Sequence, residues 1–502
     1  MSNISFKKIK LAFIILLASF FLIYKIDKPF IGHHDWNGVF FGNIANNTLK
    51  FGFLKTKFGA VSSFLPQNKT DFSFYTHYPP IFHLLLGLEA KIIGVQEWSM
   101  RFLAVIFSLI ALFLFYKTVE LVFDHKIAFV ACLFFIFNPM FLYFGKMPVH
   151  EVFGLFFIIF AIYCYIIFFL QGNKRNFFWL VLSLVLACQA VWSGYYLSFL
   201  FIVHYYFFKK KKGKKKDKFW LIGLIPLISF LSHIIYTFIL TGSWDNGLFA
   251  TMLFRMQIGD KAKAFSFTLP EYIKHEALWL TVYFTRVLCF FYLIYCLLLV
   301  KKIIKRKINF KDSFLLIILI FPFIDIIIFK NVCFIHDYKL YYFLLSIPLL
   351  ASLSLFWFKK KLEFLWKKNK LITIIIFSLI FGLFITERVK FIKTLLNTSI
   401  NKSAYDLGLI IKEKSKPGEI ILVGSKSWAE FQDLFLNFYG QRKIVYFNPD
   451  LESFEKIKSN QAKFVVFINS REKPSQDLLN LLKQDYKSFQ AKAFIFFDLK
   501  PK

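Results

Sequence analysis

The chain has 502 residues, of which 57% are hydrophobic and 21% aromatic, and its formal net charge is +33 at pH 7. Soluble domains are about 45–50% apolar, so this composition excludes an ordinary soluble protein and indicates a polytopic membrane protein. The distribution of the positive charge argues against nucleic-acid binding, because much of the lysine excess falls in short runs between apolar segments. Such runs set membrane topology and contact anionic lipid headgroups.

Apolar runs long enough to span a bilayer recur about eleven times along the chain. We expect spans near residues 9–26, 100–122, 127–144, 152–170, 177–191, 194–208, 219–240, 277–300, 313–330, 339–358 and 371–387. With a cytoplasmic N-terminus, the strongly basic connections 209–218, 301–312 and 359–370 all fall inside, as the positive-inside rule requires. We therefore expect a multi-pass protein of the plasma or inner membrane.

Two regions on the expected outer side are large. The first, residues 27–99, holds Pro79-Pro80 and then a short apolar stretch over 81–94, which predicts an interfacial helix. The second begins after the last span and is soluble in character. It carries strand-like runs at 420–424, 443–447, 464–469 and 493–498 and helical patterns near 402–415, 452–459 and 475–486. The sequence thus predicts a mainly α fold, with a transmembrane helical bundle over 1–387 and a small extracytoplasmic α/β domain over 388–502.

The first polar cluster, His33-His34-Asp35-Trp36, comes shortly after the first apolar segment. A carboxylate at the membrane–water boundary is costly unless it has a task. Glycosyl or phosphoryl transfer to a hydroxyl needs a base for the acceptor proton, and Asp35 can supply it. The alternative is a solvated loop acid. His33 and His34 could tune Asp35, bind a divalent metal ion or contact phosphate, and the sequence leaves these roles open.

A second cluster is the outer turn 146–151 (KMPVHE) between the third and fourth expected spans. Its cation, Lys146, can pair with a phosphate, and His150 and Glu151 are confined beside it. Glu151 can orient an acceptor or a metal ion. A polar turn that only caps two helices explains the same residues.

A third cluster lies between the ninth and tenth expected spans, where His336, Tyr338 and Lys339 supply donors suited to a phosphate at the lipid boundary. Interfacial anchoring explains tyrosine and lysine at that depth equally well. Arg286 lies inside the eighth expected span near its outer end. Intramembrane arginines usually face a partner or a cavity, which favours a binding role.

The segment 75–80 (YTHYPP) precedes the interfacial helix. Its two prolines fix a rigid approach to that helix and aim His77 and Tyr78, for binding or for structure alone. Arg255 is a weaker candidate for steering anions, and Asp325, well inside the ninth span, fits a helix-packing partner or a proton relay.

Together these segments resemble the glycosyltransferase family 39 type of integral-membrane GT-C enzymes. Residues 33–59 are similar to the family's acid followed by an "iARN…G" helix, and THYPPIFHLLLGLEAKIIGVQEWSMRF (76–102) is similar to its "YPPL…G…E…R" stretch. KMPVHE (146–151) resembles its "R/K-x-x-P-E" turn, and 336–351 its late "H-x-Y…P" segment. The likeness covers about residues 10–350 in order.

The resemblance implies a polyprenyl-phosphate-linked sugar as donor and a lipid, glycan or protein hydroxyl as acceptor at the outer face. It implies that Asp35 is the base, Glu151 the second acid, and the reaction inverting through an oxocarbenium-like state. Lys146, Arg286 and Tyr338 would hold the leaving phosphate. Arg101 stands where the family pattern has its arginine, and His34, His77, His150, His336 and Lys339 complete the expected binding residues. The alternatives are a lipid or solute transporter and a polysaccharide ligase.

Overall fold

The computed structural model describes residues 3–208, 218–244, 247–259, 267–362, 370–459, 461–468 and 473–501. The basic connections 209–218 and 359–370 therefore lie largely outside the described residues. The chain divides into two compact units. Unit 1 is Met1–Ile26, Tyr75–Glu89 and Trp98–Leu396, and unit 2 is Asp27–Phe74, Ala90–Glu97 and Asn397–Lys502.

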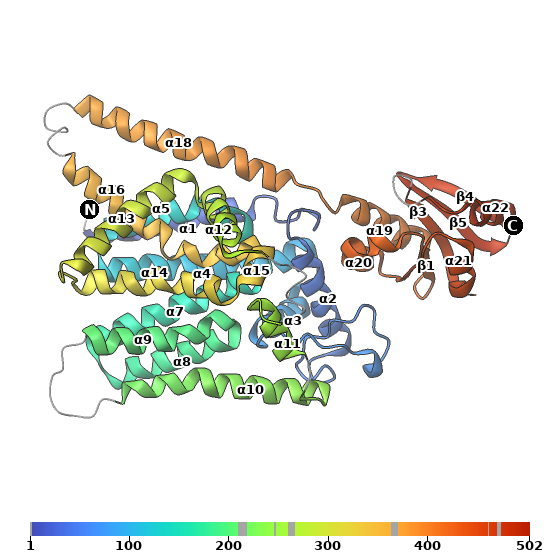
Figure 1. Ribbon diagram of the computed structural model, residues 1–502, viewed down its shortest axis with the longest axis horizontal. Coiled ribbons are helices and arrows are strands. Elements are labelled where there is room, and N and C mark those ends of the chain that lie inside the picture. The colour runs from blue at the N-terminus through green and yellow to red at the C-terminus, as the bar shows by residue number, and fades with distance from the viewer. Residues whose placement is uncertain are drawn as a thin grey trace. The chain divides into compact units, whose positions relative to one another are not determined.

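Helices are the regular secondary structure of unit 1 among its described residues (Figure 1). Its first half contains α1 (Asn3–Ile23), α3 (Ile81–Ile93), α4 (Glu97–Val122), α5 (His125–Ile136), α6 (Pro139–Phe144), α7 (His150–Gln171), α8 (Lys174–Ala190), the short 3₁₀ helix η2 (Trp192–Gly194) and α9 (Tyr195–Phe208). Its second half contains η3 (Phe219–Gly223), α10 (Leu224–Thr241), α11 (Leu248–Arg255), α12 (Leu269–Phe284), α13 (Arg286–Ile304), α14 (Phe310–Ile328), α15 (Lys330–Ile335), η5 (Asp337–Leu344), α16 (Ile347–Lys361) and α18 (Lys370–Asn397).

The expected fold class is confirmed, and each expected span contains a helix. Among the described residues, α4, α7, η3 with α10, and α13 are long and apolar enough to cross a membrane. A fifth crossing is formed if η5 and α16, which meet at a bend of 47°, act as one span. The central helix is α7, because 72% of its apolar window is buried against 22% for α13.

Several expected spans are interrupted where the sequence supplies a cap or a turn. The third breaks at Asn138, whose side chain caps α6 ahead of Pro139. The eighth, expected as one run over 277–300, is two helices, because Thr285 adopts a φ of 66° and its hydroxyl caps α13. Breaks of this kind leave polar groups and backbone carbonyls at the ends of the bundle.

A tight turn joins α8 to α9 through η2. The turn needs Gly194, since a Cβ there would lie 2.4 Å from the Ala187 carbonyl oxygen. It also needs Gly154 on α7, where a Cβ would lie 2.6 Å from a Val191 methyl group. In Figure 1, α7, α8, α9 and α10 run alongside one another, and η2 is held against α7 at one end of this group.

Unit 2 combines the first outer loop with the C-terminal region. Its elements are α2 (Trp36–Phe51), η1 (Lys69–Asp71), α19 (Lys402–Lys414), β1 (Ile420–Val423), α20 (Lys426–Gly440), β2 (Lys443–Tyr446), α21 (Leu451–Ile457), β3 (Ala462–Ile468), α22 (Gln476–Asp485), β4 (Tyr486–Ala491) and β5 (Phe494–Pro501). The strands form one sheet in the order β2-β1-β3-β5-β4, with β1 parallel to β2 and β3, and β5 antiparallel to β3 and β4. The α/β character of this region is as predicted.

The first outer loop is anchored to the C-terminal region by specific contacts inside unit 2. The Phe30 backbone N–H donates to the Tyr439 hydroxyl at 2.8 Å, and the Lys28 ammonium donates to the Thr398 carbonyl at 2.7 Å. A Cβ on Gly42 of α2 would lie 2.8 Å from the Phe438 ring of α20, so the two helices approach closely. These contacts fix the start of α2, where Asp35 lies.

Candidate functional site

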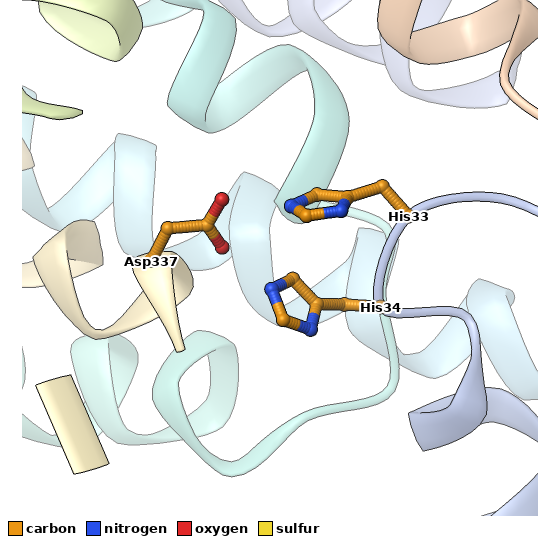
Figure 2. Close-up of side chains that lie close together, drawn as sticks. All are labelled: His33, His34 and Asp337. Carbon is orange, nitrogen blue, oxygen red and sulfur yellow. The ribbon is translucent and has the colours of Figure 1, made fainter. Parts of the chain in front are cut away.

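Asp35 immediately precedes α2 in unit 2. Its carboxylate accepts the Gly32 N–H at 2.6 Å and only 6% of the residue is exposed. His33 and His34 leave the same loop side by side, as Figure 2 shows. Their ring centroids are 4.1 Å apart. His34 has a φ of 55°, a conformation rare for residues other than glycine. Unit 2 thus holds a buried acid beside two partly exposed imidazoles.

Lys146, an expected phosphate ligand, and Arg101, an expected binding residue, both contact the chain just after α1. Lys146 donates to the Tyr24 carbonyl, and Arg101 donates to the Ile26 carbonyl at 2.9 Å. Both cations therefore donate to backbone carbonyls of the segment that follows α1. Arg286, also expected at the phosphate, is exposed at the first position of α13, where its backbone N–H donates to Glu387 at 3.1 Å.

The third expected cluster divides between two environments. Lys339 is buried within unit 1, whereas His336 is partly exposed and stacks on Tyr338 with a centroid distance of 5.1 Å. Asp337, labelled in Figure 2, accepts the Tyr283 hydroxyl. Successive residues of η5 thus enter different surroundings.

Three residues from separate sequence clusters meet in unit 1. The Lys339 ammonium of η5 donates to Glu151, in the first turn of α7, and to the Tyr78 hydroxyl at 2.9 Å. All three side chains are buried. Burial raises the pKa of Tyr78 against the opposing effect of Lys339, so the phenol keeps its proton. The His150 ring stacks on Tyr78 with centroids 3.9 Å apart, which fixes the phenol's orientation.

A second cation reaches the same tyrosine from α11. The Arg255 guanidinium lies 4.7 Å from the centre of the Tyr78 ring and donates to the His77 carbonyl at 3.4 Å. That carbonyl also accepts the Trp192 indole N–H at 2.8 Å, while the His77 ring contacts Thr251 at 3.1 Å. Burial, together with the charge of Arg255, lowers the pKa of His77 to about 4. His77 is therefore neutral at physiological pH.

A small cavity of about 10 Å³, enough for roughly one water molecule, opens between these elements of unit 1. It is lined by Tyr78, Val191, Trp192, Ser193, Arg255, Phe329, Val332, Lys339 and Tyr342. Two cations, two phenols and a serine hydroxyl thus share a wall of otherwise apolar and aromatic residues. Such a set favours an anion with several acceptor oxygens and an apolar substituent, as a lipid phosphate has.

Behind the cavity wall lies a buried acid. The Ser193 hydroxyl of η2 donates to one oxygen of Asp325, on α14, at 2.5 Å. Sequence reasoning gave Arg255 and Asp325 minor roles and did not single out Ser193. The available signal was a polar VWSGYY turn between two unusually short spans, which placed Ser193 at a bundle end without showing what it faces.

The chain is similar to known proteins in part of its sequence and in its fold. Residues 77–236 match the family model described as dolichyl-phosphate-mannose-protein mannosyltransferase. ArnT from Cupriavidus metallidurans bound to undecaprenyl phosphate superposes with a TM-score of 0.65 and 11% sequence identity, covering 99% of this chain and 98% of that one. The chain has the GT-C fold. No curated protein sequence matches it significantly.

A second GT-C structure is similar over most of this chain. The archaeal oligosaccharyltransferase AglB from Archaeoglobus fulgidus, in complex with an inhibitory peptide and a dolichol-phosphate, gives a TM-score of 0.58 at 14% identity. The superposed region covers 98% of this chain and 74% of the AglB chain. The family match and the apolar helices together mark an integral membrane protein of the GT-C type.

Proposed function

We propose that this protein transfers a sugar from a polyprenyl-phosphate donor to an acceptor hydroxyl at the outer membrane face. The observation that carries the proposal is the cavity of unit 1, in which Lys339 and Arg255 share a wall with Tyr78. The similar structures support the choice of ligand, since ArnT is bound to undecaprenyl phosphate and AglB is in complex with a dolichol-phosphate.

The lining of the cavity would hold the phosphate that leaves with the lipid, and the cavity would have to widen from about 10 Å³ as the donor binds. As the bond between sugar and phosphate oxygen breaks, negative charge grows on the phosphate, and cations fixed in a water-poor site stabilise that charge most effectively. Arg255 offers several donors in a planar fork, and the Lys339 ammonium can shift from Glu151 toward the phosphate. Glu151 would keep Lys339 charged and positioned before the donor arrives.

Asp35 is the proposed base. Its carboxylate would take the proton of the acceptor hydroxyl, whose oxygen forms the new bond to the anomeric carbon. The old carbon–oxygen bond breaks with its electron pair remaining on the phosphate, and attack from the opposite side inverts the anomeric centre. The positive-inside pattern of the lysine runs supports a cytoplasmic N-terminus, with the first outer loop and the C-terminal region outside.

The base is tested by sugar transfer from a panel of polyprenyl-phosphate sugars to water or a supplied acceptor, with the purified protein. We expect Asp35→Asn to lower turnover by at least about 100-fold, in keeping with the loss of a general base. Asp71→Asn is the matched control, because Asp71 is an exposed acid of the same outer loop. Wild-type turnover by a folded Asp35→Asn variant would remove Asp35 from this role.

A further inference from the structure

Ser193 of η2 and Asp325 of α14 form a buried hydrogen-bonded pair behind the cavity. Both residues are at least 97% buried, and their hydrogen bond is 2.5 Å long. The second carboxylate oxygen of Asp325 has no hydrogen-bond partner among the described residues. A buried acid with one unsatisfied oxygen is costly in its charged form, so its protonation state responds to charges nearby.

The hydrogen-bond direction matters because Ser193 lines the cavity that contains Lys339 and Arg255. A hydroxyl has one proton to donate. While that proton points at an ionised Asp325, only the lone pairs of Ser193 are available to a ligand, and these repel a phosphate oxygen. If Asp325 is protonated, it can donate to Ser193, whose own proton is then free for the phosphate.

Charge balance leads to the same conclusion. The groups that act electrostatically on Asp325, from the helices packed around it, are Lys339, Glu151, Tyr196, Tyr272, Tyr342 and Cys333. On and behind the cavity wall, the two cations Lys339 and Arg255 equal in number the two acids Glu151 and an ionised Asp325. A phosphodiester adds one negative charge, and one proton on Asp325 restores neutrality where solvent screening is weak.

We propose that Ser193 and Asp325 form a proton-coupled gate, in which the donor's phosphodiester binds together with one proton that is taken up by Asp325. This inference rests on the proposed function of the cavity and adds a regulation to it. Donor affinity would rise as the pH falls, because the complex holds one more proton than the free protein.

The probe that tests the gate is the methyl ester of undecaprenyl phosphate in detergent micelles. This phosphodiester keeps a single charge between pH 5.5 and 8.5, so any pH dependence comes from the protein. His77, with a pKa of about 4, stays neutral over the same range. Binding is measured at each pH for the full-length wild type and the variants Asp325→Asn and Ser193→Ala.

The wild-type Kd is expected to rise up to tenfold per pH unit over the range in which Asp325 is ionised in the free protein. Asp325→Asn mimics the protonated acid, since its amide donates to Ser193, and should bind tightly with the pH dependence abolished. Ser193→Ala should bind more weakly than Asp325→Asn at every pH. Ser183→Ala, another buried serine, of α8, should match the wild type.

The outcomes separate the gate from the function on which it rests. Weaker binding by Asp325→Asn than by the wild type at pH 8, or an unchanged pH dependence in that variant, would overturn the gate. A wild-type affinity that depends on Lys339 but not on pH would also overturn the gate. That result would leave the phosphate site itself supported. Absence of binding at any pH would overturn the phosphate site as well.

Discussion

The Lys339 ammonium is bonded to an acid and a phenol in a part of unit 1 that excludes most water. Removing one member of a buried ion pair typically costs about 3–5 kcal/mol, because the other charge is left without a partner. Replacing a buried ion pair by apolar residues often leaves the free energy of unfolding unchanged, so stability alone gives little reason for the Lys339–Glu151 pair. A cation that an incoming phosphate can recruit is the functional reason that we favour.

His77 provides a test at the level of one residue. Its pKa of about 4 lies below the value of about 6.5 in an unfolded chain, so the folded protein binds fewer protons between these two values. Stability is therefore expected to fall as the pH falls from about 6.5 to about 4. His77→Gln can keep the contact with Thr251 and cannot titrate. We expect its melting temperature in detergent to drop less than that of the wild type between pH 7 and pH 4.5, and an equal drop would refute the buried, neutral imidazole.

Sequence patterns predicted which residues belong to the site better than they predicted which residues contact one another. Glu151, Tyr78 and Lys339 came from three separate motifs, and the structure brings them into contact. The same patterns assigned Lys146 to phosphate, and the fold places its ammonium on the carbonyl of Tyr24. Local spacing shows which residues lie at a bundle end, but the partner of a long flexible cation depends on residues distant in sequence.

At the level of elements, the cavity depends on how closely η2 approaches α7. Gly154→Ala would bring a methyl group within 2.6–2.9 Å of Val191 and the Tyr342 hydroxyl. Such overpacking costs about 1–3 kcal/mol, and η2 must move, carrying Ser193 with it. We expect a lower melting temperature and weaker binding of undecaprenyl phosphate.

The matched control is Gly382→Ala in α18, where no atom lies within 4 Å of the added Cβ. An exposed helical glycine replaced by alanine gains up to about 1 kcal/mol of helix propensity, so this variant should be as stable as the wild type or more stable. If Gly154→Ala were as stable and bound as tightly as Gly382→Ala, η2 would not depend on this contact.

The positions of helices could be predicted from the sequence where a long apolar run marks them. They could not be predicted where a single capping residue decides whether a run is broken. The spans and three of the helices of unit 2 follow from apolar periodicity. The break at Thr285 depends on one hydroxyl cap. Strand β4 depends on its pairing with β5, because its own mostly exposed, lysine-bearing sequence gives no strand signal. Helix α20, which holds Phe438 and Tyr439 against the first outer loop, was not anticipated either.

For the whole molecule, contacts between distant segments decide the organisation. Residues 27–74 belong to the same compact unit as the C-terminal region, although more than 300 residues separate them in the chain. Hydropathy shows that both segments are outside the bundle and cannot show that they pack together. The association is made by the Tyr439 hydroxyl, which also donates to Glu97 at 3.0 Å, and by the Phe438 ring.

The central claim is that the cavity of unit 1 binds the phosphate of a polyprenyl lipid. Its most direct test is the Kd for undecaprenyl phosphate at pH 7 of the purified wild type, Lys339→Gln, Arg255→Ala and Lys305→Ala. Lys339→Gln keeps hydrogen-bonding capacity beside Glu151, and Lys305 is an exposed lysine of the 301–312 connection. We predict that the first two variants bind at least about tenfold more weakly, a loss of about 1.4 kcal/mol or more, and that Lys305→Ala binds as the wild type does. Wild-type affinity in both Lys339→Gln and Arg255→Ala would contradict the account.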